Sequence, residues 1–367
     1  MSTYFDVTGI SSDKQYLARI GAKEGIAVYN VEMTRKITPL KDLVAIIKLY
    51  KLIKKYKPLI IHTHTPKAGL LGMIAAGLAN APIRLHTVAG MPLMEARGVK
   101  RKILNITEWL TYRLATKVYP NSKNLKQFIV DNKFCLPAKL KVIGNGSSNG
   151  IDADHFKPNG STIRKSIELK SELRLTDDNF VFLFVGRLVK DKGIEELVKA
   201  FLTIHKQYPH IRLLLVGPFE HELDPLSASC VEQIEINENI LSVGFQSDVR
   251  PYLMLSNALV FPSYREGFPN VPMQAGCFDL PCIVSDINGC NEIIEDGENG
   301  LIIPVKDTVA LKVSMERLLT DKLLLLKLKA NARRMIVDRY EQRYFWSLLL
   351  DEYQELLKNH GTVSQDI

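Results

Sequence analysis

Short runs of apolar and β-branched residues alternate along the whole chain with longer segments of helical periodicity. In the first half, the apolar runs predict strands near residues 5–10, 27–31, 59–63, 84–88, 117–119 and 141–143. In the second half, strands are predicted at 180–185, 213–216, 241–243, 258–261, 282–284 and 301–303. Strands that alternate with helices are typical of parallel sheets covered by helices. The pattern predicts an α/β fold with two Rossmann-like, doubly wound domains.

The helical segments and one turn-rich stretch indicate where the domains meet. An amphipathic helix is predicted from about 40 to 56, with one apolar stripe made of Leu40, Leu43, Val44 and Ile47. The stretch GNGSSNG at 144–150 has turn chemistry and is interpreted as an interdomain hinge. We expect an N-terminal domain at 1–152 and a C-terminal domain at 153–341, with a helix at 342–360 that packs back on the first domain.

Length and composition favour a soluble protein of two domains. A chain of 367 residues with 46% hydrophobic and 24% charged residues has an ordinary globular composition. The five cysteines form neither a C-x-x-C pair nor a metal-binding spacing with histidine, so we expect reduced thiols and a cytoplasmic location. We expect neither a signal peptide nor a membrane span, because the apolar runs are too short.

Positive charge is concentrated in the first part of the chain. Residues 1–150 hold 24 Lys and Arg against 8 Asp and Glu, a net charge of +16, whereas the remainder holds 24 against 32, a net charge of −8. Such asymmetry points to an anionic partner, and a solvated lysine-rich surface is the alternative interpretation. No recognition motif supports nucleic acid, so we expect no nucleic-acid partner.

Two basic clusters favour an anionic membrane surface as a partner. One face of the helix predicted at 40–56 carries three lysines, Lys48, Lys51 and Lys55. The second cluster, RGVKRK at 97–102, is followed by Trp109 and Tyr112. A basic surface with apolar residues suits peripheral docking on anionic lipid, which we expect at the inner face of the plasma membrane.

The run FVFLFVGRLVKDKG at 180–193 is predicted to form a strand, a loop and the start of a helix. Gly186 lets the chain turn sharply, and Arg187 and Lys192 then project from the loop. Two cations beside a helix N-terminus, beyond the carboxyl end of a parallel strand, suit a diphosphate. A surface loop with solvated charges is the competing interpretation, and the spacing is not that of a Walker loop.

The run FPSYREGFPNVPMQ at 261–274 shows the same order of strand, loop and helix. Asn270 is predicted to be the N-cap of the helix, and the backbone N–H groups of residues 267–271 are expected to face an anion or sugar hydroxyls. Glu266 lies at the loop apex, where a carboxylate can bind a sugar diol. The alternative for Glu266 is an ion pair with a nearby arginine, Arg265 or Arg250.

Histidines mark the ends of two predicted strands in the first half. His62 and His64 share one strand face, but no third ligand appears at a suitable spacing, so we expect no metal. His64 and Lys67 are interpreted as part of a polar wall on the acceptor side, with Lys67 available to an acceptor phosphate. His86 is expected at a strand end that faces the same site, and the alternative is a satisfied core histidine.

Four of these segments together resemble the retaining family 4 glycosyltransferases, which have the GT-B fold. The matching motifs are NGID at 149–152, GRLVKDKG at 186–193, EGFPN at 266–270 and SDING at 285–289. The resemblance covers the second half in the expected order and implies two Rossmann-like domains that face each other across a cleft. The first half, with HTHTPKAG at 62–69, resembles bacterial members that build capsule, O-antigen or protein-glycan precursors.

The resemblance implies a nucleotide-sugar site in the C-terminal domain. Arg187 and Lys192 are then expected to neutralise the donor diphosphate and Glu266 to hold the transferred sugar, with His86 as a further catalytic candidate. The remaining donor-binding candidates are Gly186, Gly267, Phe268, Pro269, Asn270, Val271 and Gln274. Because Gln274 stands where the family usually has a second glutamate that grips the donor ribose, we expect weaker donor affinity rather than loss of activity.

The implied activity is that of a retaining hexosyltransferase that works by front-face attack, without a metal or another cofactor. Its donor is expected to be a nucleotide-diphosphate sugar, in particular a UDP-sugar. Its acceptor is expected to be a glycan or a polyprenyl-diphosphate-linked sugar in the assembly of bacterial surface polysaccharides.

One departure from the family keeps other functions open. Family members begin with a strand, a glycine-rich loop and a helix ahead of the segment that matches YFDVTGISS at 4–12, and we expect that this first strand–loop–helix is absent here. Together with Gln274, this departure supports the alternative of a truncated, catalytically weak nucleotide-sugar-binding protein. A sugar-nucleotide epimerase on the same fold is the other alternative.

Overall fold

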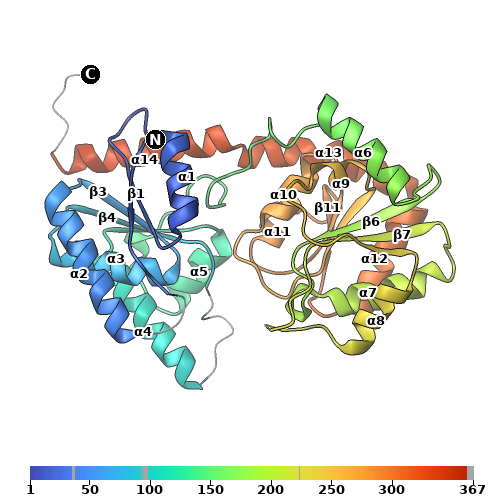
Figure 1. The fold of residues 1–367 in the computed structure, drawn as a ribbon, viewed down its shortest axis with the longest axis horizontal. Helices are drawn as coiled ribbons and strands as arrows, with labels where there is room; N and C mark the ends of the chain where they lie inside the picture. The colour runs from blue at the N-terminus through green and yellow to red at the C-terminus, as the bar shows by residue number, and fades with distance from the viewer. Residues whose placement is uncertain (35–37, 92, 94–97, 223, 362–367) are drawn as a thin grey trace. The chain divides into compact units, whose positions relative to one another are not determined.

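The computed structural model describes residues 1–34, 38–91, 93, 98–222 and 224–361. The chain forms two compact units, of which the first is Met1–Ser148 with Tyr344–Ile367 and the second is Asn149–Arg343 (Figure 1). The boundary at 148/149 lies within the predicted hinge at 144–150, four residues before the predicted boundary at 152/153. We refer to these parts as the first and second units.

The strands of the first unit form two separate parallel sheets. The smaller sheet pairs β1 (Thr8–Ser11) with β2 (Ala27–Asn30), and the larger has the order β3 (Ile60–His64), β4 (Ile83–Val88), β5 (Lys117–Pro120). Within the described residues no strand joins the two sheets, and the expected absence of an N-terminal strand stays a prediction. The strand predicted at 141–143 is wrong, because only Leu140 forms an isolated bridge to Val118 before the glycine-rich turn begins.

Helices cover the larger sheet of the first unit. Helix α3 packs between α2 and α4, and a serine cap begins α5, where the side chain of Ser122 accepts a hydrogen bond from the amide of Leu125. The helices of this unit are α1 (Lys14–Glu24), α2 (Pro39–Tyr56), α3 (Pro66–Leu78), α4 (Gly98–Leu114), α5 (Lys123–Asp131), the 3₁₀ helix η2 (Pro137–Lys139) and α14 (Gln342–Asn359).

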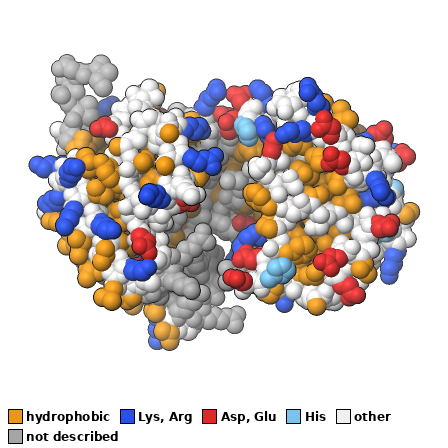
Figure 2. All heavy atoms as spheres, in the orientation of Figure 1, with side chains coloured by type: hydrophobic (Ala, Val, Ile, Leu, Met, Phe, Trp, Pro, Cys, Tyr) orange, Lys and Arg blue, Asp and Glu red, His pale blue; other side chains and the backbone are white. Residues whose placement is uncertain are grey.

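Helix α2 turns the apolar stripe that the sequence predicts toward solvent. An apolar stripe in such a helix normally faces the core, yet Leu40 is 83% exposed and Leu43, Val44 and Ile47 are exposed as well. The buried face is instead Ala45, Leu49 and Ile53, which pack beside Ala75 and Ala76 of α3. Small side chains on both helices allow close approach, and this selects one of two apolar stripes. On the face drawn in Figure 2, apolar and basic side chains lie next to each other over α2.

Helix α14 packs its apolar side on the larger sheet of the first unit. One buried cluster contains Phe345 and Leu357 of this helix together with Ile83, Leu85 and Tyr119. Glu352 is 4% exposed, accepts a hydrogen bond of 3.0 Å from the Tyr119 hydroxyl and forms an ion pair with Lys141. Because a buried carboxylate without donors is costly, these two donors stabilise the packing of α14 in its observed position.

The second unit is built on one parallel sheet of six strands, all of which the sequence predicts. The strand order is β11-β10-β9-β6-β7-β8, so the order reverses between β6 and β9. The strands are β6 (Phe180–Val185), β7 (Ile211–Val216), β8 (Ile240–Ser242), β9 (Ala258–Phe261), β10 (Cys282–Ser285) and β11 (Gly300–Ile303). Apart from the short edge strand β8, most of their side chains are buried, as expected for a sheet that is covered on both faces.

Helices flank this sheet and complete its core. Phe201 and Leu197 of α7 are fully buried in the same cluster as Phe182 and Phe184 of β6. The helices of the second unit are α6 (Gly160–Glu172), the 3₁₀ helix η3 (Lys190–Lys192), α7 (Ile194–His205), α8 (Ala228–Ile236), α9 (Arg250–Met254), α10 (Asn270–Gly276), α11 (Cys290–Ile293), α12 (Thr308–Thr320) and α13 (Lys322–Tyr340). Among the described residues, no helix of either unit combines the length and apolarity that a membrane crossing requires.

Replacing Glu352 by alanine is expected to lower the free energy of unfolding of the first unit by about 1–3 kcal/mol, because the buried Tyr119 hydroxyl loses its acceptor. Both tryptophans, Trp109 and Trp346, belong to this unit, so urea denaturation followed by tryptophan fluorescence reports on it alone. Glu355→Ala is the matched control, since Glu355 lies 4.0 Å from the same Lys141 but its side chain is 66% exposed. We expect it to cost less than about 0.5 kcal/mol, and equal losses in the two variants would contradict the role of Glu352.

Candidate functional site

The loops that follow β6 and β9 lie side by side at the point where the strand order of the second sheet reverses. β6 and β9 are neighbours, and the chain continues from them toward opposite edges of the sheet. Ligands of open α/β sheets bind beyond the carboxyl ends of the strands at such a point. The fold therefore brings together the two segments that the sequence predicts for the donor, 186–193 and 261–274.

Two glycines allow the loops of this site to approach closely. Gly193 has a φ of +70° between η3 and α7, and a Cβ there would lie 2.2 Å from the carbonyl oxygen of Pro262. Gly217 follows β7 with a φ of +151°, and its Cβ would lie 1.8 Å from the carbonyl oxygen of Gly186. No side chain is tolerated at such distances, so these glycines are what lets the loops after β6, β7 and β9 touch.

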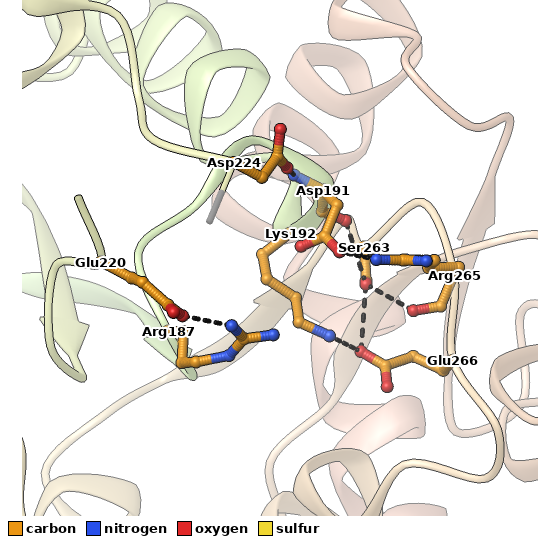
Figure 3. Close-up of polar contacts among 8 residues, drawn as sticks. All are labelled: Arg187, Asp191, Lys192, Glu220, Asp224, Ser263, Arg265 and Glu266. Carbon is orange, nitrogen blue, oxygen red and sulfur yellow. Dashed lines mark hydrogen bonds and ion pairs between the residues drawn. The ribbon is translucent and has the colours of Figure 1, made fainter. Parts of the chain in front are cut away.

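An ion pair joins the loop after β6 to the loop after β9. Lys192 Nζ lies 2.5 Å from Glu266 Oε1, and each side chain is 16% exposed (Figure 3). The buried hydroxyl of Ser263 donates to the same carboxylate oxygen at 3.0 Å. Two donors on one oxygen fix the orientation of the carboxylate. Figure 3 shows the second oxygen of Glu266 directed away from both donors.

Neighbouring carboxylates fix the rest of the loop after β6. Asp191 accepts two hydrogen bonds from the guanidinium of Arg265, at 3.0 and 2.9 Å, and its amide donates to Asp224 at 2.7 Å. Arg250, the other arginine considered as a partner of Glu266, pairs with Asp248 at 2.8 Å. The structure thus pairs Glu266 with Lys192 and uses the arginines to hold other parts of the second unit.

Arg187 stands at the beginning of the same loop and also has a carboxylate partner. Its side chain is 48% exposed and forms an ion pair with Glu220, which follows β7 and is 26% exposed (Figure 3). Arg187 and Lys192 therefore project from the two ends of one short loop, each held by a carboxylate from a different neighbouring loop. This arrangement can present two cations to an anionic ligand.

The loop after β9 is fixed by contacts within the second unit. Asn288 Nδ2 donates to the carbonyl of Gly267 at 2.5 Å, and Phe268 is 9% exposed. Helix α10 begins at Asn270, so the predicted N-cap is wrong by one residue: Pro269, with φ −74° and ψ 133°, already has the extended conformation of that position. Since proline has no N–H, the predicted row of five amides at 267–271 contains four donors.

His86 lies in the interior of the first unit, and not at an open strand end as predicted. It is 2% exposed, Thr63 Oγ1 lies 2.9 Å from its Nδ1, and a Cβ on Gly69 would lie 2.4 Å from its ring. Side chains of a strand alternate between the two faces of the sheet, and the His86 side chain points to the face that α3 covers. Burial lowers the pKa of His86 to about 3, and this neutral ring is the core histidine of the alternative interpretation.

The two predicted acceptor-side residues differ in their surroundings. His64 is exposed at the end of β3, and its ring stacks on His62 with centroids 4.5 Å apart. Lys67 of α3 lies 2.6 Å from a carboxylate oxygen of Asp42 on α2. An acceptor phosphate would therefore compete with Asp42 for Lys67. Across the part of the chain that the structure describes, no three His, Cys, Asp or Glu residues gather as metal ligands.

The second unit thus brings together the predicted donor residues, and it adds residues that the sequence reasoning missed. Gly186, Arg187 and Lys192 lie on one loop, Glu266 lies in the middle of the other, and Val271 and Gln274 follow on α10 as half-buried residues. The missed residues are Asp191, Ser263, Glu220 and Asn288. Asp191, Ser263 and Asn288 lie within segments that the sequence singles out, but only the pairing of the loops shows which groups they contact.

Two family models match the chain. The model "Glycosyl transferase 4-like" matches residues 1–122, and the model "Glycosyl transferases group 1" matches residues 165–335. The second match contains both loops of the site described above.

Curated relatives match over most of their own length. The capsular polysaccharide biosynthesis glycosyltransferase CapM of Staphylococcus aureus is 32% identical over 353 residues, which are 96% of this chain and 90% of CapM. The UDP-Gal:alpha-D-GlcNAc-diphosphoundecaprenol alpha-1,3-galactosyltransferase of Escherichia coli is 31% identical over 314 residues, which are 84% of this chain and 78% of that enzyme.

Solved structures share the fold. HepE of Anabaena, solved in complex with UDP and glucose, superposes with a TM-score of 0.80 over 95% of this chain and 91% of HepE, at 19% sequence identity. The expected GT-B fold is confirmed.

Acidification is expected to destabilise the first unit through two histidines, the buried His86 and the half-buried His62. Burial is the main cause that holds the pKa of His62 well below its usual value, and electrostatic repulsion from His64 and His86 lowers it further. Burial lowers the pKa of His86 to about 3. In the unfolded chain both have pKa values of about 6.5. Below that pH the unfolded state takes up protons that the folded state does not, so stability falls as the pH is lowered. Between pH 7.5 and 5.5 we expect a loss of about 1.4 kcal/mol from His86, and His62 adds to the loss in the same direction.

Urea denaturation at the two pH values, followed by tryptophan fluorescence, measures this loss. His86→Gln is expected to reduce the difference between the two pH values by about 1.4 kcal/mol, whatever it does to stability at pH 7.5. His360→Gln, at an exposed histidine of the first unit, is the control and should leave the difference unchanged. A pH dependence that His86→Gln does not reduce would refute this assignment.

Proposed function

This chain belongs to the group 1 glycosyltransferases, and from that membership we propose that it transfers a sugar, with retention, from a UDP-sugar to a polyprenyl-diphosphate-linked acceptor. The donor proposal is supported by the UDP in the HepE structure and by the UDP-galactose in the name of the Escherichia coli relative. The acceptor proposal is supported by the diphosphoundecaprenol in the name of that relative. Capsule or other surface polysaccharide is the proposed product, in keeping with CapM.

The pairing of Lys192 and Glu266 beside Arg187 is the observation that carries this proposal. When the sugar leaves its donor, the bond between the anomeric carbon and the diphosphate oxygen breaks and its electrons remain on the diphosphate. Cations already in place stabilise that growing charge without reorganising at the moment of reaction. Lys192 is mostly buried, so its charge acts in a medium of lower polarity than water.

Glu266 is proposed to bind the transferred sugar. Ser263 and Lys192 fix one of its carboxylate oxygens, and the other is available to accept a hydrogen bond from a sugar hydroxyl. We propose that the acceptor hydroxyl attacks the anomeric carbon from the side that the diphosphate leaves, which retains the configuration. The proton of the acceptor then passes to the departing phosphate, and neither a metal ion nor a resident cofactor takes part.

Gln274 supports the alternative of a weak nucleotide-sugar-binding protein on the same fold, so the effect of this residue on donor binding separates the two functions. A Gln side chain can accept one hydrogen bond from a ribose hydroxyl and donate another, so we expect donor binding to persist at reduced affinity. Release of nucleoside diphosphate in the presence of acceptor supports the transferase, whereas donor binding without turnover supports the alternative.

Lys192→Ala is expected to lower kcat for sugar transfer by about 100- to 1000-fold, because it removes a cation aimed at the leaving group. Lys190→Ala is the matched control, since Lys190 is an exposed lysine of the same 3₁₀ turn and its loss changes the net charge equally. We expect the control to stay within about twofold of the wild type. Release of nucleoside diphosphate measures both, and near-wild-type transfer by Lys192→Ala would remove this assignment.

We further propose that the first unit docks on an anionic membrane through exposed apolar faces of α2 and α4. The stripe on α2 is the one described above, Leu40, Leu43, Val44 and Ile47. On α4 a second stripe is exposed at spacings of four, three and three residues: Val99 by 74%, Ile103 by 40%, Ile106 by 63% and Trp109 by 45%. Such spacing places the four side chains on one side of the helix. Tyr112, expected beside them, is fully buried and does not belong to this surface.

Cations accompany both stripes. Lys48, Lys51 and Lys55 are exposed on α2, and α4 exposes Arg101, Lys102 and Arg113. Arg97 of the predicted cluster lies outside the described residues. The first unit as a whole has 25 Lys and Arg against 12 Asp and Glu, a net charge of +13. Apolar side chains flanked by cations suit the boundary between headgroups and acyl chains of anionic lipid, so we propose peripheral association with the inner face of the plasma membrane.

Ile106→Asp is expected to reduce binding to vesicles of 30% phosphatidylglycerol in phosphatidylcholine by about tenfold, because a carboxylate replaces an inserting side chain and opposes the anionic surface. Ile236→Asp is the matched control: Ile236 is 65% exposed on α8 of the second unit. Co-sedimentation measures both, and in a Trp346→Phe background a blue shift of Trp109 fluorescence reports insertion. Equal effects of the two substitutions, or binding that is independent of anionic lipid, would overturn the docking proposal.

A further inference from the structure

Glu220 is held next to Arg187 by backbone pairing that continues beyond the strands. The ladder between β6 and β7 ends at the pair Val185 and Val216. Past it, the amide of Leu188 donates to the carbonyl of Pro218 at 2.9 Å, and Leu188 forms a further parallel bridge to Phe219. The backbone of Glu220 therefore has a fixed place beside the loop after β6.

Further contacts fix the loop after β6 against the segment after β7. Leu188 is fully buried, which anchors the loop after β6 between its two cations. The segment after β7 also supplies Asp224, whose side chain accepts a hydrogen bond of 2.7 Å from the amide of Asp191. The segment after β7 thus follows the loop after β6 along its length, and Glu220 is the member that faces Arg187.

The two carboxylates that pair with the cations of the site differ in their support. Glu266 accepts hydrogen bonds from Lys192 and from the buried Ser263. Among the described residues, Arg187 is the one donor that contacts the Glu220 side chain. Glu266 is therefore fixed whether or not a ligand is present. Glu220, in contrast, is held by Arg187, which is the residue that a diphosphate would bind.

We propose that Glu220 competes with the donor diphosphate for Arg187 and so sets the affinity for nucleoside diphosphates. This inference rests on the proposed function, because it requires a diphosphate at Arg187. A diphosphate next to Arg187 lies within a few ångströms of the Glu220 carboxylate, and like charges at that distance repel. Binding then requires the Arg187–Glu220 pair to loosen, and its re-formation assists release of the nucleoside diphosphate product.

Glu220→Gln is expected to tighten UDP binding by about three- to tenfold, since it removes both the competing ion pair and the repulsion. Glu222→Gln is the matched control: Glu222 is an exposed carboxylate two residues along the same segment, so its loss changes the charge of the segment equally. Isothermal titration with UDP, repeated with GDP, measures the dissociation constants of wild type and variants. Thermal melts of the ligand-free proteins check that each variant remains folded.

A double-mutant cycle with Arg187→Gln separates competition from general repulsion. If Glu220 acts through Arg187, Glu220→Gln should tighten binding by less than about twofold once Arg187 is gone. An undiminished gain in the Arg187→Gln background, or a gain no larger than that of Glu222→Gln, overturns this inference while the proposed function stands. If the wild type binds neither UDP nor GDP, the proposed function fails together with the inference.

Discussion

The ion pair between Lys192 and Glu266 is the interaction on which the geometry of the candidate site depends. It joins the loops after β6 and β9, which are neighbours because the strand order of the second sheet reverses between them. Gly193 and Gly217 let the backbones approach to distances that any side chain would forbid. A cation and an oriented carboxylate are therefore in place before a ligand arrives, and groups in place beforehand need little reorganisation during the reaction.

Most of the second unit could be predicted because buried parallel strands have a strong local signature. The run FVFLFV at 180–185 is apolar on both faces of the sheet, and its short length and aromatic and β-branched residues favour a buried strand over a helix. Gly186 and Glu266 could be identified because each lies close behind such a strand. Ser263 and Asp191 lie in the two predicted donor segments, which a backbone hydrogen bond of 2.8 Å joins, from the amide of Tyr264 to the carbonyl of Asp191. No local pattern predicts a pairing between residues so far apart in the sequence.

Besides the burial of Tyr112, the first unit differs from the prediction at three places, each for a different physical reason. Residues 141–143 have strand composition, but Gly144 and Gly146 have positive φ angles and bend the chain after one bridge. Apolar residues lie on more than one side of α2, so periodicity alone does not show which side is buried. The side with Ala45 is buried because this small residue lets α2 approach α3 closely. His86 lies in a strand as predicted, although two residues before its end, and only the arrangement of helices around the sheet shows that its side of the sheet is covered.

The second unit must bind an anionic donor, under our proposal, although it holds 23 Lys and Arg against 28 Asp and Glu, a net charge of −5. Its overall charge does not attract the donor, so binding depends on local cations. Both cations are already paired, Arg187 with Glu220 and Lys192 with Glu266. Donor binding exchanges one anionic partner for another at Arg187, whereas Lys192 keeps Glu266 and contacts the diphosphate in addition. The free energy of donor binding gained at Arg187 is the difference between its ion pair with the diphosphate and its ion pair with Glu220, which keeps the affinity for the bound substrate modest. As the sugar leaves, negative charge grows on the diphosphate, while the charge of the carboxylates stays the same. The cations therefore stabilise the transition state more than the bound substrate, and this difference accelerates the reaction.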